Sequence, residues 1–141
     1  MYQLIYLPII ATILAQIIKM IINGIKGEFT WKDLNSYGGM PSSHTALVTA
    51  LAAAIGFYQG WDSAAFAISV ILAVIVIRDA AGFRRILGKH AFELNQIIHT
   101  LRPENNYKFQ HLRERLGHTP LEILAGMALG ILVVTLYIIL F

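Results

Sequence analysis

Residues 121–141 read LEILAGMALGILVVTLYIILF, a run in which Glu122 is the single charged residue. A helix needs about 20 consecutive apolar residues to cross the hydrocarbon core of a bilayer. In lipid, an isolated segment satisfies all of its own backbone hydrogen bonds only as a helix. The stretch therefore predicts a membrane-spanning helix.

Three earlier apolar runs predict three further spans, at residues 2–22, 45–58 and 63–77. No lysine or arginine precedes Lys19, so the first run is expected to be a retained anchor, not a cleaved signal peptide. The other two runs are short and are expected to extend through polar ends or to be shielded by neighbouring helices. We predict an all-α integral membrane bundle of about four spans, forming a single domain over residues 1–141.

The composition supports this class of protein and excludes others. The 141 residues are 57% hydrophobic and 13% charged, which is unlike a soluble domain. The absence of cysteine removes disulfides, thiolate nucleophiles and Cys-ligated metal sites. The formal net charge is +3, but no soluble basic domain or aromatic platform is present to hold a nucleic acid. Membrane lipids, and phosphate groups or anionic lipid headgroups, are the expected partners.

A polar segment at residues 78–120 separates the third and fourth spans and is too long to be a simple connecting loop. Within it, apolar residues fall on one helical face, namely Leu87, Ala91, Leu94, Ile98 and Leu101. This pattern predicts an amphipathic helix that lies at the membrane interface and is stopped by Pro103. A second short helix is predicted near residues 107–116, so the segment would hold one or two interfacial helices.

Small residues at four-residue spacing predict close helix packing. Ala46, Ala50 and Ala54 would let another backbone approach the second span closely. Gly126 and Gly130 form a GxxxG pair in the last span, which we interpret as a packing groove more readily than as a dimer contact.

The lysines and arginines lie at the end of the first span, in the loop that follows it, or in residues 78–120. The positive-inside rule then places both loops in the cytoplasm and both termini outside, in a multi-pass protein of the cell membrane. Basic residues that bind phosphate for catalysis would not be a guide to this topology.

Three polar segments fall on the same side of the membrane in this arrangement: residues 38–44 before the second span, 78–85 after the third, and 117–122 before the fourth. Together they carry two histidines, several arginines and two acids. This is the set of side chains that phosphoryl transfer needs, so we predict one phosphate-handling site at this face.

The first segment contains the start of a helix. A helix that begins near Ser42 points free backbone N–H groups and a positive dipole end toward its entrance, where Ser43 and His44 would also meet a phosphate. Gly38 and Gly39 would let the backbone come close. The alternative is that Ser42 is simply an N-cap and His44 a polar residue at the membrane boundary.

The second segment carries two adjacent arginines. Arg84 and Arg85 would clamp phosphate oxygens, although anchoring to lipid headgroups would also explain a basic pair beside a span. Asp79 is harder to explain structurally, because a carboxylate near the membrane is costly unless it is paired or functional. We expect Asp79 to orient one of the arginines.

The third segment combines a histidine and an acid four residues apart. If the helix reaches back to His118, Glu122 lies on the same face and can orient the imidazole. The run Thr119-Pro120-Leu121-Glu122 also matches a capping box, which would explain Glu122 structurally but not His118. The remaining histidines are expected at the surface or the interface, namely His90, His99 and His111.

With these residues in view, the chain resembles the divergent branch of the type 2 phosphatidic acid phosphatase superfamily, which is related to vanadium haloperoxidases. The resemblance covers nearly the whole chain through GGMPSSHTA, RDAAGFRR followed by GKHAFELNQ, and LGHTPLEILAG. The superfamily has a PSGH segment, a later arginine, and a histidine followed four residues on by an acid.

The resemblance implies a metal-independent phosphatase with no cofactor. His118 would be the nucleophile, His44 the general acid and Glu122 the acid that orients the nucleophile. A lipid phosphate monoester, such as phosphatidic acid, phosphatidylglycerol phosphate or a prenyl phosphate, would be hydrolysed through a phosphohistidine intermediate.

The chain departs from the superfamily in three respects. The upstream KxxxxxxRP motif is absent, so Lys26 or Lys32 would have to supply positive charge. The superfamily usually has a short spacing between its arginine and its nucleophilic histidine, whereas here a long insertion separates Arg85 from His118. An alternative register from Arg84 to His90, with Glu93 three residues on, keeps the short spacing; His118 is preferred because it begins a span and aligns with the GHTPLE segment of the divergent branch. The superfamily core has six helices, so four spans imply either a reduced bundle or a homodimer.

Two rival functions use the same residues. In one, His44, Asp79, His118 and Glu122 are metal ligands for hydrolysis by a bound water. In the other, the basic pocket belongs to a noncatalytic binder or carrier of lipid phosphates. Activity that survives exhaustive chelation would exclude the metal-dependent hydrolase. Binding without turnover would indicate the noncatalytic binder or carrier.

Overall fold

The computed structural model describes residues 2–25, 27, 39–100, 110–114 and 116–141, and every regular element in these ranges is a helix. The elements, in chain order, are α1 (Gln3–Ile25), α2 (Ser43–Gln59), α3 (Ala64–Arg78), the π-helix η2 (Asp79–Phe83), α4 (Arg84–Thr100) and α5 (Pro120–Leu140). Among the described residues, three stretches are long and apolar enough to cross a membrane: α1, the continuous helix Ala64–Thr100, and α5. The prediction of an all-α membrane bundle is confirmed.

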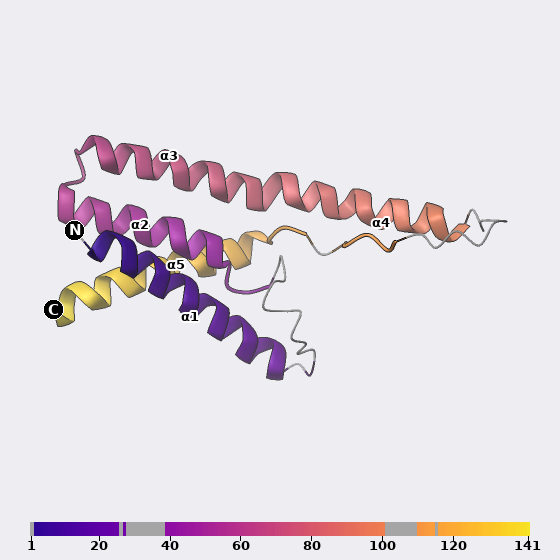
Figure 1. Cartoon of the computed structure of the whole chain (residues 1–141), viewed down its shortest axis with the longest axis horizontal. Coiled ribbons are helices and arrows are strands. Elements are labelled where there is room, and N and C mark those ends of the chain that lie inside the picture. Colours follow the sequence, from indigo (N-terminus) through magenta and orange to yellow (C-terminus); the bar gives the residue numbers. More distant parts are fainter. Residues whose placement is uncertain (1, 26, 28–38, 101–109, 115) are drawn as a thin grey trace.

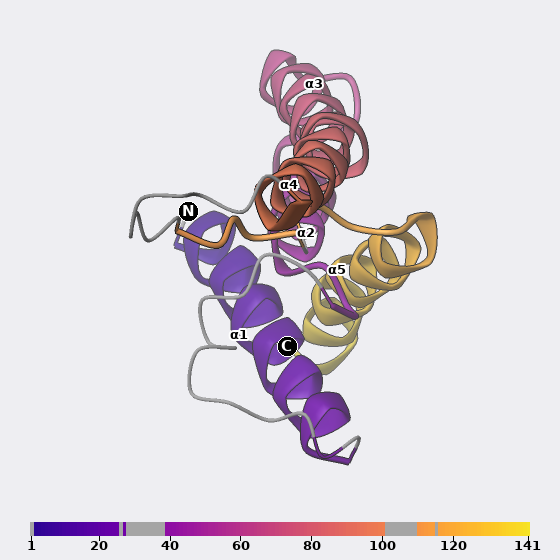
Figure 2. The same cartoon turned by 90° about the vertical axis from the view of Figure 1, so that its right-hand side faces the viewer.

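Successive spans run in opposite directions (Figure 1). The chain termini lie together at one end of the bundle, and α2 and α5 begin at the other end. The helix α2 is central, because it packs against α1, α3 and α5, while α1 also packs against α5 (Figure 2). The three polar segments of the sequence are thereby brought to one end of the molecule.

Small residues bring α2 and α5 together, as predicted. Ala46 and Ala50 are fully buried on α2. A Cβ atom added to Gly126 would lie 2.5 Å from the carbonyl oxygen of Ser42, and one added to Gly130 would lie 2.7 Å from that of Ala46. The GxxxG pair is therefore a packing groove within the chain, filled by the backbone of α2.

The third span differs from the prediction at its end. We expected a separate amphipathic helix at the membrane interface, but α3, η2 and α4 form one helix of 37 residues. The π-helix η2 spans residues 79–83 without breaking the helix, so α4 continues past the end of the bundle (Figure 1). Pro103, the predicted stop, lies outside the described residues.

The predicted short helix at residues 107–116 is wrong where the structure describes it. Residues 110–114 and 116 are not helical, and residues 107–109 and 115 lie outside the described part. The backbone of Leu112 bonds instead to the side chain of Asn95 on α4. The nitrogen of Leu112 donates to Oδ1 of Asn95 at 3.0 Å, and Nδ2 of Asn95 donates to the carbonyl oxygen of Leu112 at 2.9 Å. These bonds replace the local ones that a helix would have made.

Candidate active site

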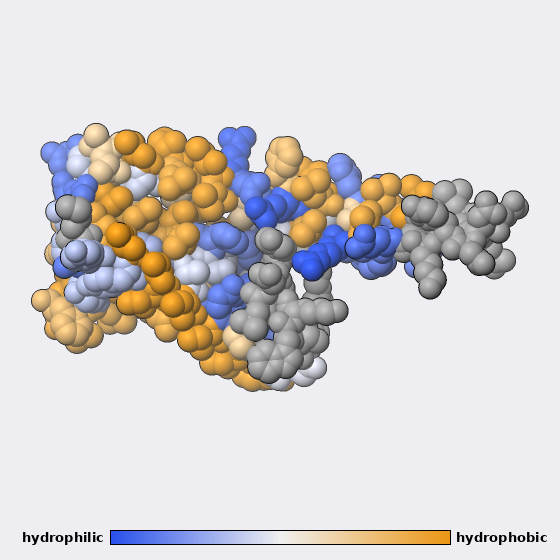
Figure 3. All heavy atoms as spheres, in the orientation of Figure 1, coloured by the Kyte–Doolittle hydropathy of each residue, from blue (hydrophilic) through white to orange (hydrophobic). Residues whose placement is uncertain are grey.

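A cavity of about 600 Å³ lies at the end of the bundle where α2 begins and α3 ends. Leu47, Ile75 and Val76 form part of its wall. Figure 3 shows that the apolar surfaces of α1 and α3 are separated by a more hydrophilic band. The polar and charged side chains that line the cavity are Thr12, Gln16, Lys19, Ser43, His44, Asp79, Arg84 and His118.

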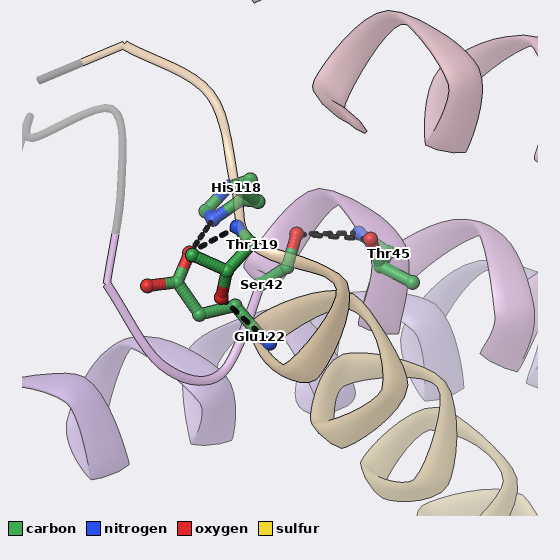
Figure 4. Close-up of polar contacts among 5 residues, drawn as sticks. All are labelled: Ser42, Thr45, His118, Thr119 and Glu122. Atoms are coloured by element: carbon green, nitrogen blue, oxygen red, sulfur yellow. Dashed lines mark hydrogen bonds and ion pairs between the residues drawn. The ribbon is translucent and has the colours of Figure 1, made fainter. Parts of the chain in front are cut away.

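His118 and Glu122 form a close pair at this cavity. His118 is 7% exposed, and its Nδ1 lies 3.0 Å from Oε2 of Glu122. The same oxygen accepts a hydrogen bond from the backbone nitrogen of Thr119 at 3.0 Å, and the nitrogen of Glu122 donates to Oγ1 of Thr119 at 3.3 Å (Figure 4). The two sequence interpretations of Glu122 are therefore both realised: it caps α5 and it orients the imidazole.

The backbone of His118 is held by the π-helix. Its nitrogen donates to the carbonyl oxygen of Ala80 at 3.0 Å. Gly117 has a φ of 84°, and a Cβ atom there would lie 2.7 Å from the backbone nitrogen of Arg85, so this position requires glycine. π-Helices are rare and often occur at functional sites. Here η2 brings the segment that carries Arg84 against the segment that carries His118.

Asp79 and Arg84 form an ion pair at the cavity wall. Nε of Arg84 donates to Oδ2 of Asp79 at 2.7 Å, with both side chains almost half exposed. The contact pairs Asp79 with one of the two arginines, as its expected role in orienting an arginine requires. The contact holds the guanidinium group beside the cavity that His118 also lines.

The first turn of α2 supplies Ser43 and His44. Ser43 is buried, His44 is exposed, and both line the cavity. Several charged or titratable side chains lie close enough to act electrostatically on His44, namely Arg84, His118, Lys19 and Asp79. The two histidines of the predicted site are thus brought together with an arginine and an acid.

Ser42 has a structural position. It is fully buried, and its Oγ accepts from the nitrogen of Thr45 at 3.4 Å and from Oγ1 of Thr45 at 2.9 Å (Figure 4). Ser42 is the N-cap of α2 and does not line the cavity. The capping interpretation therefore explains its side chain.

The other predicted residues lie apart from the cavity. Arg85 lines a second, more open cavity of about 370 Å³, together with Lys89 and Glu93. His90, the nucleophile of the alternative register, is exposed on α4 and does not line the first cavity. Lys26 falls outside the described residues. Of the two arginines and the two candidate nucleophiles, the structure brings Arg84 and His118 together.

Lys19 is a cavity residue that was not predicted from the sequence. This side chain is 2% exposed, comes from the apolar helix α1, and lines the cavity. A Cβ atom at Gly39 would lie 3.5 Å from its methylene groups, so the loop before α2 packs against it. The available signal was a polar stripe at helical spacing, Thr12, Gln16 and Lys19, in an otherwise apolar span. Ionisable residues within spans usually mark functional sites.

The residues that the structure describes do not form the ligand set that the metal hypothesis requires. In those residues no three or more His, Asp or Glu side chains are grouped so that they could hold a metal ion.

The fold and the cavity define an integral membrane protein of the helical class, with a basic, histidine-containing cavity at one end of its bundle. The chain belongs to the divergent PAP2 family, whose sequence profile matches residues 2–133. It is 39% identical over 134 residues to the uncharacterized membrane protein YuiD of Bacillus subtilis (strain 168), a match that covers 86% of this chain and 85% of the relative. No solved structure matches the chain.

Proposed function

We propose that this protein is a membrane phosphatase that hydrolyses a lipid phosphate monoester through a phosphohistidine intermediate, without a metal ion. The observation that carries the proposal is the pair formed by His118 and Glu122 at 3.0 Å, in which His118 lines a cavity together with Lys19, His44 and Arg84. Membership of the divergent PAP2 family supports it.

The nucleophile of the proposed reaction is Nε2 of His118. When Nδ1–H donates to the carboxylate of Glu122, the lone pair of the imidazole resides on Nε2. That lone pair attacks phosphorus, a bond forms between nitrogen and phosphorus, and the ester bond between phosphorus and oxygen breaks. The carboxylate stabilises the positive charge that develops on the imidazole.

His44 acts as the general acid and then as the general base. In the first step its imidazolium gives a proton to the departing alkoxide, which leaves as the lipid alcohol. In the second step neutral His44 takes a proton from a water molecule as that water attacks phosphorus. The bond between His118 and phosphorus breaks, inorganic phosphate leaves, and both histidines return to their starting states.

Positive side chains bind the phosphate in this proposal. Arg84 is held at the cavity wall by Asp79, and Lys19 enters from α1. Ser43 and the first turn of α2 add a hydroxyl group and the positive end of a helix dipole. Lys19 would supply the charge that the missing KxxxxxxRP motif provides elsewhere in the superfamily.

A lipid is the proposed substrate because the cavity has two kinds of wall. The phosphate-binding end is charged, whereas Leu47, Ile75 and Val76 form an apolar wall deeper in the bundle. A lipid tail would lie between the spans while its headgroup meets the two histidines. The orientation we propose puts this end of the bundle at the cytoplasmic face of the cell membrane, following the positive-inside rule.

The test is phosphate release by the purified chain in lipid nanodiscs from a panel of lipid phosphates, with and without exhaustive chelation. We expect release that resists chelation. In His118→Asn, release should stop while inorganic phosphate still binds and the protein stays folded, because an amide cannot form the phosphorylated intermediate. Loss of activity on chelation would favour the metal hydrolase, and phosphate binding without any release would favour the carrier.

The paired histidine variant separates the two roles. His44→Asn should slow the hydrolysis of lipid phosphates far more than the hydrolysis of an activated aryl phosphate, because the alkoxide leaving group of a lipid phosphate needs a proton. His90→Asn is the control and should retain wild-type activity. Activity that survives in His118→Asn but disappears in His90→Asn would show that the alternative register is correct.

A further inference from the structure

Residues 110–114 and 116–118, here called the return segment, run back beside α4 to the start of α5 (Figure 1). One side chain of α4 faces this segment and is almost completely buried. Asn95 is 4% exposed, whereas its neighbours Leu94 and Gln96 are exposed. A buried amide needs hydrogen-bond partners, and the return segment supplies them.

Both ends of the Asn95 amide bond to the return segment. Its Nδ2 donates to the carbonyl oxygen of Leu112 at 2.9 Å and to Oε1 of Glu114 at 2.8 Å, and its Oδ1 accepts from the nitrogen of Leu112 at 3.0 Å. Nδ2 also lies 3.4 Å from Nε2 of His111. The amide therefore fixes both the position and the orientation of the backbone of one residue, Leu112, which is 17 residues away in the chain.

The hydrogen bonds of Asn95 to Leu112 and Glu114 are here called the clasp. Two glycines let the return segment pack closely against its neighbours between this clasp and the active site. A Cβ atom at Gly88 would lie 2.4 Å from the carbonyl oxygen of Glu114, and the corresponding distance at Gly117 is 2.7 Å, to the nitrogen of Arg85. The next residue, His118, then bonds through its nitrogen to Ala80. Contacts among the described residues thus lead from Asn95 to the residue proposed as nucleophile.

We infer that Asn95 is a positioning residue for His118, acting through the backbone of the return segment. The inference rests on the proposed function. Asn95 does not line the cavity, so its effect on the site is indirect, and its side-chain hydrogen bonds lead to the backbone of Leu112. Of the phosphate-binding side chains, Lys19 belongs to α1, and Arg84 begins α4 but is held by its ion pair with Asp79. Loss of the clasp should therefore misplace the nucleophile and leave phosphate binding intact.

The test compares ground-state and transition-state binding in Asn95→Ala. Inorganic phosphate reports binding alone, whereas orthovanadate accepts a fifth ligand and mimics the pentacoordinate phosphorus formed when His118 attacks. We expect kcat to fall by about 10- to 100-fold, because small misplacements of a reacting group have effects of this size. Vanadate inhibition should weaken in proportion, while phosphate inhibition stays within about twofold. Gln96→Ala, at the exposed neighbouring position, is the matched control and should change neither.

A second variant keeps the test decisive if Asn95→Ala does not fold. Asn95→Asp retains an acceptor for the nitrogen of Leu112 but places a carboxylate beside that of Glu114, so the clasp should open when the introduced group ionises. Protonated, the group can donate again. The ratio of the kcat of Asn95→Asp to that of the wild type should therefore be nearer to one at low pH and fall as pH rises, with KM unchanged.

Several outcomes would overturn the inference. They are a folded Asn95→Ala with wild-type kcat, equal weakening of phosphate and vanadate inhibition, or a flat pH dependence of the Asn95→Asp ratio. Failure of the proposed function looks different, since the wild-type protein would then release no phosphate from any substrate. If the wild type also bound vanadate no better than phosphate, both ideas would fall together.

Discussion

Oε2 of Glu122 lies 3.0 Å from Nδ1 of His118 and 3.0 Å from the backbone nitrogen of Thr119. The start of α5 and the orientation of the histidine therefore depend on the same carboxylate oxygen. Such an arrangement makes His118 rigid relative to the span that follows it. It also means that replacing Glu122 with alanine would disturb the helix and the chemistry together.

Glu122→Gln should separate these two effects. A glutamine can still accept from the nitrogen of Thr119, so the capping box should survive and stability should change by less than about 1 kcal/mol. The neutral amide no longer stabilises a positively charged His118, so kcat should fall by about 100-fold or more. Thermal unfolding and phosphate release on the same preparation check this, with Glu122→Ala expected to lose both. Full activity in Glu122→Gln would reduce the carboxylate to a cap.

Lys19→Met should weaken phosphate binding while keeping the unbranched shape of the side chain. Removal of one charge from a partly desolvated phosphate site should raise the inhibition constant of inorganic phosphate by about tenfold or more. Lys19→Arg should retain more of the affinity. Lys89→Met is the control, because Lys89 is exposed on α4 and lies outside the main cavity. Equal effects at both positions would indicate a general loss of positive charge, with no specific site for Lys19.

Gly126→Ala should destabilise the bundle. The new Cβ atom would lie 2.5 Å from the carbonyl oxygen of Ser42, so α2 and α5 would have to separate at a cost of about 1–3 kcal/mol. Gly24→Ala is the matched control in α1, where nothing lies within 4 Å, and it should be neutral or stabilise by up to about 1 kcal/mol. Thermal unfolding in the same detergent measures both. Similar midpoints for the two variants would contradict the close packing of α2 on α5.

Single cysteines should report the two faces of the bundle, since the chain contains no cysteine of its own. Met40→Cys lies just before the start of α2, and Gln110→Cys lies in the return segment that leads to the start of α5. Tyr2→Cys lies just before α1, and Trp61→Cys lies between the end of α2 and the start of α3; all four positions are exposed. A membrane-impermeant maleimide should label one pair from the cytoplasmic side and the other pair from outside. Labelling of positions 40 and 110 from opposite sides would sink the shared-site arrangement.

Features that depend on neighbouring residues were predictable from the sequence. The apolar runs predicted the spans because transfer of a helix into lipid depends on its own composition. Thr119 and Glu122 predicted a capping box because both bonds close within one helical turn. The spacing of His118 and Glu122 is equally local, so their pairing followed once the start of α5 was recognised.

The choice among neighbouring side chains required the tertiary structure. Arg84 and Arg85 are adjacent and chemically identical, but successive residues of a helix point about 100° apart, and only Arg84 meets the main cavity. For the same reason, the role of Lys19 depends on which face of α1 packs against α2. The sequence contains no direct record of helix rotation, which is set by the packing of the whole bundle.

The sequence by itself determined the class of protein, the number of apolar runs and the types of side chain available for chemistry, because these follow from composition and from interactions within a few residues. Only the tertiary structure decided that α4 continues α3, and that residues 110–114 form no helix. Bonds between Asn95 and Leu112 compete there with local helical bonds, and they exist only after the chain has folded back on itself. The same return brings His118 against Ala80 and completes the site.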